Sequence, residues 1–191
     1  TVPEAGREDA ARAIDAARDA FDKGPWRRTS ALDRGKLMFK LSEAIQANAA
    51  ELAELEVKSC GKPLAEAQYD VADAANCFEF YGALATKIHG ETMSVPANSV
   101  SYVVREPVGV CGQIIPWNFP LLMAAWKLAP ALACGNTAVL KPAETTPLSA
   151  LLLAEICQEA ELPPGVVQVI PGDGETGAAL VRADGIDKVA F

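Results

Sequence analysis

The chain has 191 residues, of which half are apolar and 22% are charged, a balance typical of a soluble globular protein with its own core. The net charge is −8 and no basic cluster exists, which argues against nucleic acid and anionic membranes as partners. No apolar run reaches the roughly 18 residues of a membrane span, and the acidic first residues do not read as a signal peptide. These features predict a cytoplasmic protein.

The cysteines and the histidine give no sign of a metal site or a disulfide framework. The five cysteines are widely spaced, lack a C-x-x-C pair and lie in apolar stretches, which favours reduced, buried thiols. The single histidine, His89, has no partner at metal-ligand spacing. We therefore expect no bound metal.

The first 88 residues are expected to be helical. Apolar periodicity predicts helices over 7–22, from near Ser30 to about residue 60, and over 65–86. Ser30 and Asp33 resemble a capping box at the second helix, and Gly61 and Pro63 end it. The expected buried faces are Ile14, Ala17 and Phe21, then Leu37, Leu41, Ile45, Leu52 and Leu55, then Ala72, Ala75, Phe78 and Tyr81.

Residues 89–107 change character, because the β-rich run VSYVV lies among Pro and Gly residues. This pattern predicts a hairpin or a pair of extended strands. Two interpretations stay open: an ordinary connection, or an arm that pairs across a subunit interface.

The remaining residues alternate between apolar strands and helices, which predicts a parallel sheet covered by helices on both faces. Ligands of such sheets bind beyond the carboxyl ends of the strands, here at loops 115–120, 141–146 and 171–177. The expected strands are 110–116, 137–141, 166–170 and 188–191. The expected helices are 120–135, 146–162 with Thr146 as N-cap and Pro147 in its first turn, and 177–183.

The first loop, IIPWNFP, places Asn118 at the start of a helix whose first turn contains Pro120. The Asn118 amide has two possible roles: it caps the helix, or it donates to an oxyanion that develops beside the positive helix end. Phe119, Met123 and Trp126 follow at i, i+4 and i+7 on one helix face, which suits either core packing or a pocket wall.

The other two loops carry charged side chains. Lys141 ends a strand and Glu144 follows three residues later, so the pair forms either a local ion pair or a donor and acceptor for a ribose diol. PGDGETG spells G-x-G-x-x-G, but Asp173 and Glu175 would repel a pyrophosphate there. The dinucleotide fingerprint is therefore a weak match.

Together these loops resemble the NAD(P)-dependent aldehyde dehydrogenases, closest to the betaine-aldehyde and general aldehyde enzymes. The matching text is EPVGVCGQIIPWNFPLLMAAWKLAPALACGNTAVLKPAETTPLSA, followed by LPPGVVQVIPGDGETGAALV and IDKVAF. The resemblance spans essentially the whole chain, is weaker before about residue 85, and is most specific in PWNFP with KPAE. It implies a Rossmann-like fold divided into a helical part (1–88), a β-hairpin oligomerisation arm (89–107) and truncated cofactor-binding βαβ units (108–191).

The resemblance also implies roles for the residues around the aldehyde. Asn118 would stabilise the oxyanion, together with a backbone N–H of the nucleophilic cysteine. Phe119, Met123 and Trp126 would line the aldehyde tunnel. The partner would be a small aldehyde, and the full-length protein a homodimer or homotetramer.

For the cofactor, the resemblance implies NAD, with NADP possible. Lys141 and Glu144 would contact the adenosine ribose, and Trp117 would lie near the cofactor. Gly174 would border the adenine end of the cleft. The further expected cofactor contacts are Ile114, Ile115 and Gly177.

The complete enzyme would oxidise an aldehyde to a carboxylate through a cysteine thioester, with hydride transfer to NAD. The family's next motif begins FTGS, and its nucleophilic Cys and general-base Glu lie further along. We therefore expect an internal fragment that lacks the catalytic domain and is inactive by itself. The alternative is a non-catalytic nucleotide-binding or interaction module.

Overall fold

The computed structural model describes residues 2–191 and is built around a four-stranded parallel sheet. The strand order is β5-β4-β3-β6. The central pair is in register from Val110 opposite Thr137 to Ile114 opposite Lys141. The strand bounds are β3 Val110–Ile114, β4 Thr137–Lys141, β5 Val167–Val169 and β6 Lys188–Ala190.

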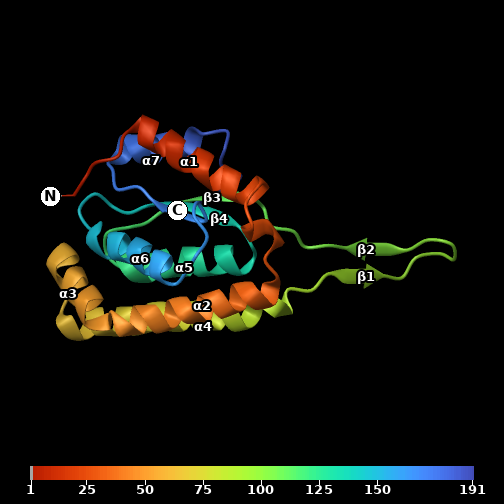
Figure 1. Cartoon of the computed structure of the whole chain (residues 1–191), viewed down its shortest axis with the longest axis horizontal. Coiled ribbons are helices and arrows are strands. Elements are labelled where there is room, and N and C mark those ends of the chain that lie inside the picture. Colours follow the sequence, from red (N-terminus) through yellow and green to blue (C-terminus); the bar gives the residue numbers. More distant parts are fainter. Residues whose placement is uncertain (1) are drawn as a thin grey trace.

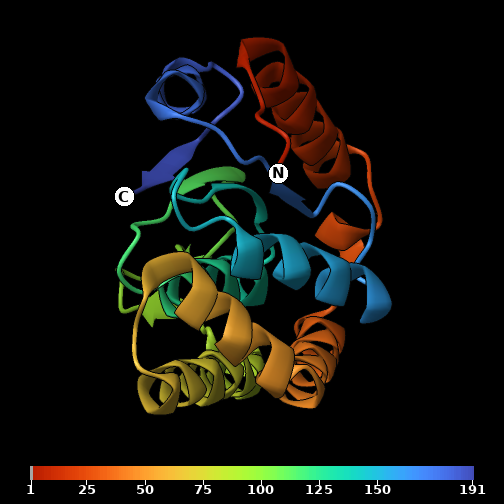
Figure 2. The same ribbon diagram turned by 90° about the vertical axis from the view of Figure 1, so that its left-hand side faces the viewer.

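Helices cover both faces of this sheet (Figures 1 and 2). The helices α1 (Arg7–Asp22) and α7 (Gly174–Arg182) lie on one face. The helices α5 (Pro120–Ala133) and α6 (Leu148–Glu159) lie on the other. The predicted doubly covered parallel sheet is confirmed.

A further helical layer packs outside α5 and α6 (Figure 2), and it differs from prediction in one place. The single long helix expected from Ser30 is two helices, α2 (Ala31–Ala47) and α3 (Ala49–Cys60). The break is at Asn48, whose side chain donates to the Ala44 carbonyl at 2.9 Å and competes with the helical ladder. At the start of α2, the Ser30 hydroxyl accepts from the Asp33 N–H, so the predicted cap is confirmed.

The third outer helix, α4 (Leu64–Leu84), buries Ala75 and Phe78 as predicted and partly buries Tyr81, but one predicted position differs. Ala72 is exposed, whereas Val71, Ala74, Ala75 and Phe78 are buried. The buried stripe therefore follows i, i+3, i+4 and i+7 from Val71, because α4 packs against both α2 and α5.

Two helix starts in the sheet domain also differ from prediction. Helix α6 begins at Leu148 with Pro147 at its N-cap position, and no side chain caps it, so the capping role predicted for Thr146 is wrong. The Thr146 N–H instead bonds the Ala143 carbonyl at 3.1 Å. Helix α7 begins at Gly174 rather than 177, because the Asp173 carboxylate accepts from the N–H groups of Glu175 and Thr176.

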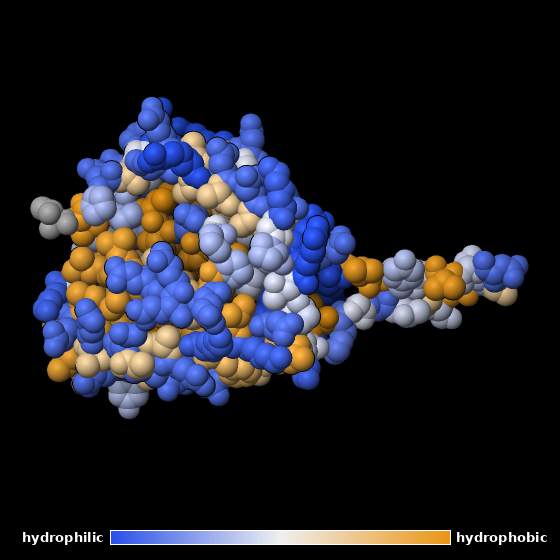
Figure 3. All heavy atoms as spheres, viewed as in Figure 1, coloured by the Kyte–Doolittle hydropathy of each residue, from blue (hydrophilic) through white to orange (hydrophobic). Residues whose placement is uncertain are grey.

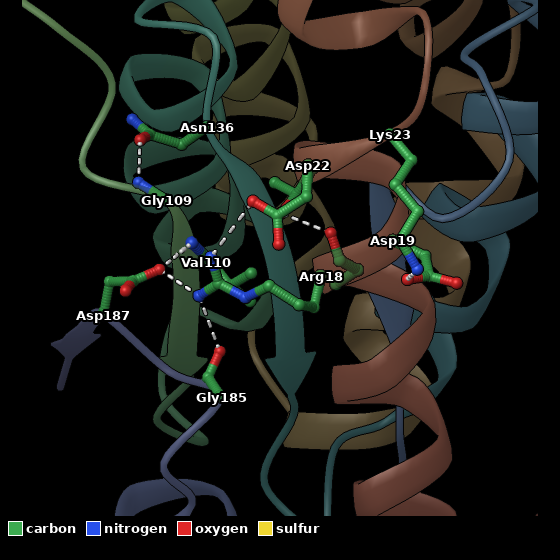
Figure 4. A network of polar contacts seen from close by, with 11 residues as sticks. Arg18, Asp19, Asp22, Lys23, Gly109, Val110, Asn136, Gly185 and Asp187 are labelled. Atoms are coloured by element: carbon green, nitrogen blue, oxygen red, sulfur yellow. Dashed lines mark hydrogen bonds and ion pairs between the residues drawn. The ribbon is translucent and has the colours of Figure 1, made fainter.

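The amino ends of the strands are held by side chains from distant segments (Figure 4). Arg18 on α1 donates to the Gly185 carbonyl at 3.0 Å and pairs with Asp187. Asp187 in turn accepts the Val110 N–H at 2.7 Å, which joins β3 to the segment leading into β6. Asn136 accepts the Gly109 N–H at 3.0 Å.

The predicted hairpin is confirmed by β1 (Glu91–Met93) and β2 (Ser101–Val103), which pair antiparallel. It projects from the body on the side away from the carboxyl ends of the sheet strands (Figure 1). Apolar side chains are exposed along it (Figure 3), and Val100 and Tyr102 are 82% and 69% exposed.

Candidate functional site

The loops after β3, β4 and β5 meet at one edge of the sheet, which Figure 2 views end on. Ile114 and Lys141 end their strands in register, and the Ile115 N–H donates to the Lys141 carbonyl at 3.0 Å. Because the strands are parallel, the side chains that follow them are brought to the same surface.

Lys141 lies beneath this edge rather than in solvent. Its side chain is buried, and its Nζ donates to the carbonyls of Pro142 at 2.9 Å and Gly172 at 2.6 Å. Burial lowers the pKa of Lys141, and the nearby carboxylates of Glu144 and Asp173 oppose this effect without reversing it. Lys141 therefore ties the loop after β4 to the loop after β5.

Glu144 lies at the rim, with its carboxylate 4.0 Å from Lys141 Nζ and its side chain 63% exposed. This separation exceeds a hydrogen bond, so Glu144 keeps its acceptor positions free toward solvent. Lys141 and Glu144 thus form the local ion pair, but each side chain keeps capacity for a further hydrogen bond.

The two predicted glycines differ in what surrounds them. A Cβ added at Gly177 would lie 3.2 Å from Lys141 Cε and 3.9 Å from Ile114 Cδ1, so Gly177 packs closely against both. A Cβ added at Gly174 would meet nothing within 4 Å, so this position borders open space.

The G-x-G-x-x-G segment does not offer a free helix N-terminus to a phosphate. The Asp173 side chain accepts the N–H of Glu175 at 2.8 Å and that of Thr176 at 3.2 Å. A carboxylate thus occupies the place where an anion would bind.

Asn118 does not cap α5. The N-cap position is Phe119 and no side chain caps this helix. Asn118 and Trp117 are exposed at the same edge as Glu144. The capping alternative is therefore wrong, and the amide of Asn118 is available to a ligand.

The apolar stripe on α5 is divided between different surroundings. Trp126 lines a cavity of about 450 Å³ with Asp73, Phe80 and Tyr81 of α4. The Phe119 ring lies 4.8 Å from Lys62 Nζ, and Met123 packs against the main core.

Sequence reasoning missed a buried polar group behind the Asn118 loop. Glu56 of α3 is fully buried and accepts the Leu121 N–H at the start of α5 at 3.3 Å. Lys62 forms an ion pair with Glu56 at 3.2 Å and another with Asp70. The available signal was a glutamate four residues after the buried Leu52, on the apolar face of its helix.

Three of the five cysteines are not activated thiols. Burial raises the pKa of Cys77 to about 11 and that of Cys157 to about 12, and it also raises the pKa of Cys111.

Within residues 2–191, no cluster of His, Cys, Asp and Glu side chains is arranged to hold a metal ion. In the same range, no helix is both long and apolar enough to cross a membrane.

The sequence and fold both match known proteins. The Aldehyde dehydrogenase family matches residues 1–191. The whole chain aligns, over 193 residues, with betaine aldehyde dehydrogenase of Bacillus subtilis (strain 168) and with human retinal dehydrogenase 2. It is 50% identical to each of them. The aligned region covers 39% of the Bacillus protein and 37% of the human one.

Among solved structures, the NAD+ complex of aldehyde dehydrogenase from Bacillus cereus matches 98% of this chain with a TM-score of 0.97 and 47% identity. Here too the chain spans only 39% of the matched protein. The family match over residues 1–191 and the structural match point to the same family. The chain belongs to the aldehyde dehydrogenase family.

Proposed function

We propose that this chain forms the cofactor-binding part of an enzyme that oxidises an aldehyde to a carboxylate with NAD. The observation that carries the proposal is the exposed Asn118 amide. It lies at the start of a helix that no side chain caps, on the same sheet edge as Lys141 and Glu144. Residues 1–88 would form the helical part of this domain, 89–107 its arm, and 108–191 its βαβ units.

The rim residues suit the ribose of a dinucleotide. An ammonium has three N–H donors, and Lys141 uses two on backbone carbonyls, which leaves one for a ribose hydroxyl. The exposed Glu144 carboxylate can accept from the second hydroxyl. The open space beside Gly174 leaves room for a flat ring at this end.

The same carboxylate favours NAD over NADP. A 2′-phosphate placed against Glu144 would meet a like charge at short range. Lys141 offsets this only in part, because two of its donors are already engaged. Trp117, Ile114, Ile115 and Gly177 would complete the wall of the cofactor cleft.

Asn118 would be the side-chain donor for the reacting oxygen at the start of α5. Pro120 has no N–H, and the Leu121 N–H is already taken by Glu56. The Asn118 amide would donate to the oxygen that becomes negative when a nucleophile attacks the aldehyde carbon, beside the positive helix end. NAD, when bound, supplies the acceptor for the hydride.

The nucleophile would come from outside these 191 residues. The raised pKa values of Cys77, Cys111 and Cys157 keep those thiols protonated near neutral pH, and thiolate is the reactive form. We expect the 191-residue chain alone to produce no NADH from an aldehyde.

The arm would pair with a second copy in a homodimer or homotetramer. It exposes apolar side chains on a ribbon that has no covering element in residues 2–191. The free cysteines and the acidic composition suit the reducing cytoplasm.

A turnover assay tests the proposal. Full-length protein incubated with NAD and a panel of aliphatic and aromatic aldehydes should form NADH, and the Asn118→Ala variant should form far less. If NAD binds but no aldehyde is oxidised, the protein is a nucleotide-binding module instead.

A further inference from the structure

Glu56 is a fully buried carboxylate that reaches the Asn118 loop from a helix outside the sheet. Its Oε1 atom accepts the Leu121 N–H at 3.3 Å and also the Ser149 hydroxyl. One oxygen thus joins α3 to the starts of α5 and α6.

The other carboxylate oxygen of Glu56 faces a lysine. Oε2 lies 3.2 Å from Lys62 Nζ, as an ion pair without hydrogen-bond geometry. Lys62 is largely buried, pairs also with Asp70 of α4, and places its ammonium 4.8 Å from the centre of the Phe119 ring. Burial lowers the pKa of Lys62, but its two carboxylate partners outweigh burial, so the pKa is raised and the lysine stays charged.

These contacts bracket Asn118. Phe119, the next residue, is held by its ring against Lys62, and Leu121 is held by its N–H against Glu56. Asn118 itself is exposed and has no cap bond to fix it, so the backbone on its carboxyl side sets its position.

A net gain in stability is a weak explanation for the buried ion pair itself. A buried ion pair is often no better for stability than apolar side chains of the same volume, because both charges lose their hydration. Helix α5 also has no side-chain cap at Phe119, so Glu56 supplies from α3 the acceptor that the local sequence does not.

We propose that Glu56 and Lys62 are positioning residues, which fix the start of α5 so that the Asn118 amide points at the reacting oxygen. The proposal rests on the proposed function of Asn118. Small displacements of a group that stabilises a transition state cost large factors in rate, so these residues should affect turnover more than cofactor binding.

The test uses the full-length enzyme with Glu56→Gln and Lys62→Met. Matched controls are Glu54→Gln and Lys58→Met, which break the exposed ion pair on the same helix, 3.1 Å long. Each variant is assayed for kcat, NADH affinity and melting temperature, alone and combined with Asn118→Ala. The combination is a double-mutant cycle that reports whether Glu56 acts through Asn118.

We expect each buried-site substitution to lower kcat about tenfold, roughly what a sub-ångström misplacement costs. NADH affinity should change less than about twofold, and the control variants should match wild type. In the Asn118→Ala background, Glu56→Gln should cost less than about twofold, because the group that it positions is gone.

Three results would overturn the proposal: unchanged kcat in both buried-site variants, an equal loss in the controls, or a tenfold loss that persists without Asn118. If Glu56→Gln does not fold, Lys62→Met and Ser149→Ala carry the same cycle. Full turnover in Asn118→Ala would contradict the proposed function itself, whereas a persistent loss contradicts only the positioning role.

Discussion

Replacing Lys141 by Met should loosen the edge of the sheet at which we propose the cofactor site. The Lys141 ammonium bonds the Pro142 carbonyl at 2.9 Å and the Gly172 carbonyl at 2.6 Å. Both residues are buried, so water does not readily replace the lost donor. Methionine fills a similar volume and cannot donate, which isolates the polar contribution.

The size of the effect follows from these two bonds. Hydrogen bonds to a charged group contribute roughly 1.5–3 kcal/mol each, so the pair contributes about 3–6 kcal/mol. Removing the buried charge and burying more apolar surface returns part of this, on the order of 1–3 kcal/mol. We expect the free energy of unfolding to fall by about 2–3 kcal/mol.

Urea unfolding of the full-length protein measures this change as a lower midpoint at an unchanged m value. Lys127→Met is the matched control, because burial also lowers the pKa of Lys127. NAD affinity should fall about tenfold or more in Lys141→Met, since the donor that we propose for the ribose is lost. Wild-type stability in this variant would show that Lys141 does not tie the two loops together.

The lowered pKa of Lys141 adds a pH dependence with a definite sign. Between its folded pKa and the higher pKa of the unfolded chain, the unfolded state binds more protons, so this lysine makes stability rise with pH. The difference in stability between wild type and Lys141→Met should therefore grow in favour of wild type as the pH rises through that window. A difference that is flat or shrinks would contradict the assignment.

The other predictions concern the rim, the arm and the core. Glu144→Gln should raise kcat/KM with NADP relative to NAD, because it removes the charge that repels the 2′-phosphate; an unchanged ratio would place the 2′ position elsewhere. Tyr102→Asp together with Val104→Asp should shift the full-length protein to smaller species in light scattering, because these exposed arm residues (69% and 62%) would meet a partner. A molar mass equal to that of wild type would mean that the arm is not an interface. Trp26→Phe should lower the free energy of unfolding by about 2 kcal/mol, since the buried indole N–H donates to the Asn136 carbonyl at 2.9 Å; a loss below about 0.5 kcal/mol would contradict that role.

The strands and the hairpin could be predicted because their signals are local. The β-branched and apolar residues of 137–140, between turn residues, are typical of a strand in a sheet covered on both faces, and all of β4 is buried. The break at Asn48 could not be predicted with the same ease, because a side-chain bond to its own helix competes with a pattern that otherwise continues. The start of α7 differs from the prediction because Asp173 caps this helix, whereas its charge in a glycine-rich loop indicates only repulsion of a phosphate.

The candidate site could also be predicted only in part. The parallel-strand pattern predicted that the loops after the strands would form one surface, and in the structure Gly177 packs closely against Lys141 and Ile114. The Glu56 and Lys62 contacts join segments about 60 residues apart, so no spacing rule reveals them. The only indication in the sequence was Glu56, a charged residue on the apolar face of its helix.

The most direct test of the account is the turnover of Asn118→Ala and Asn118→Asp in the full-length enzyme. An amide that donates mainly in the transition state should be needed for kcat and not for NADH binding. We predict that Asn118→Ala lowers kcat by about 10²–10³ with NADH affinity and melting temperature near wild type. Asn118→Asp should lose at least as much, because a carboxylate would face the oxyanion. Turnover close to wild type in either variant would contradict the central claim.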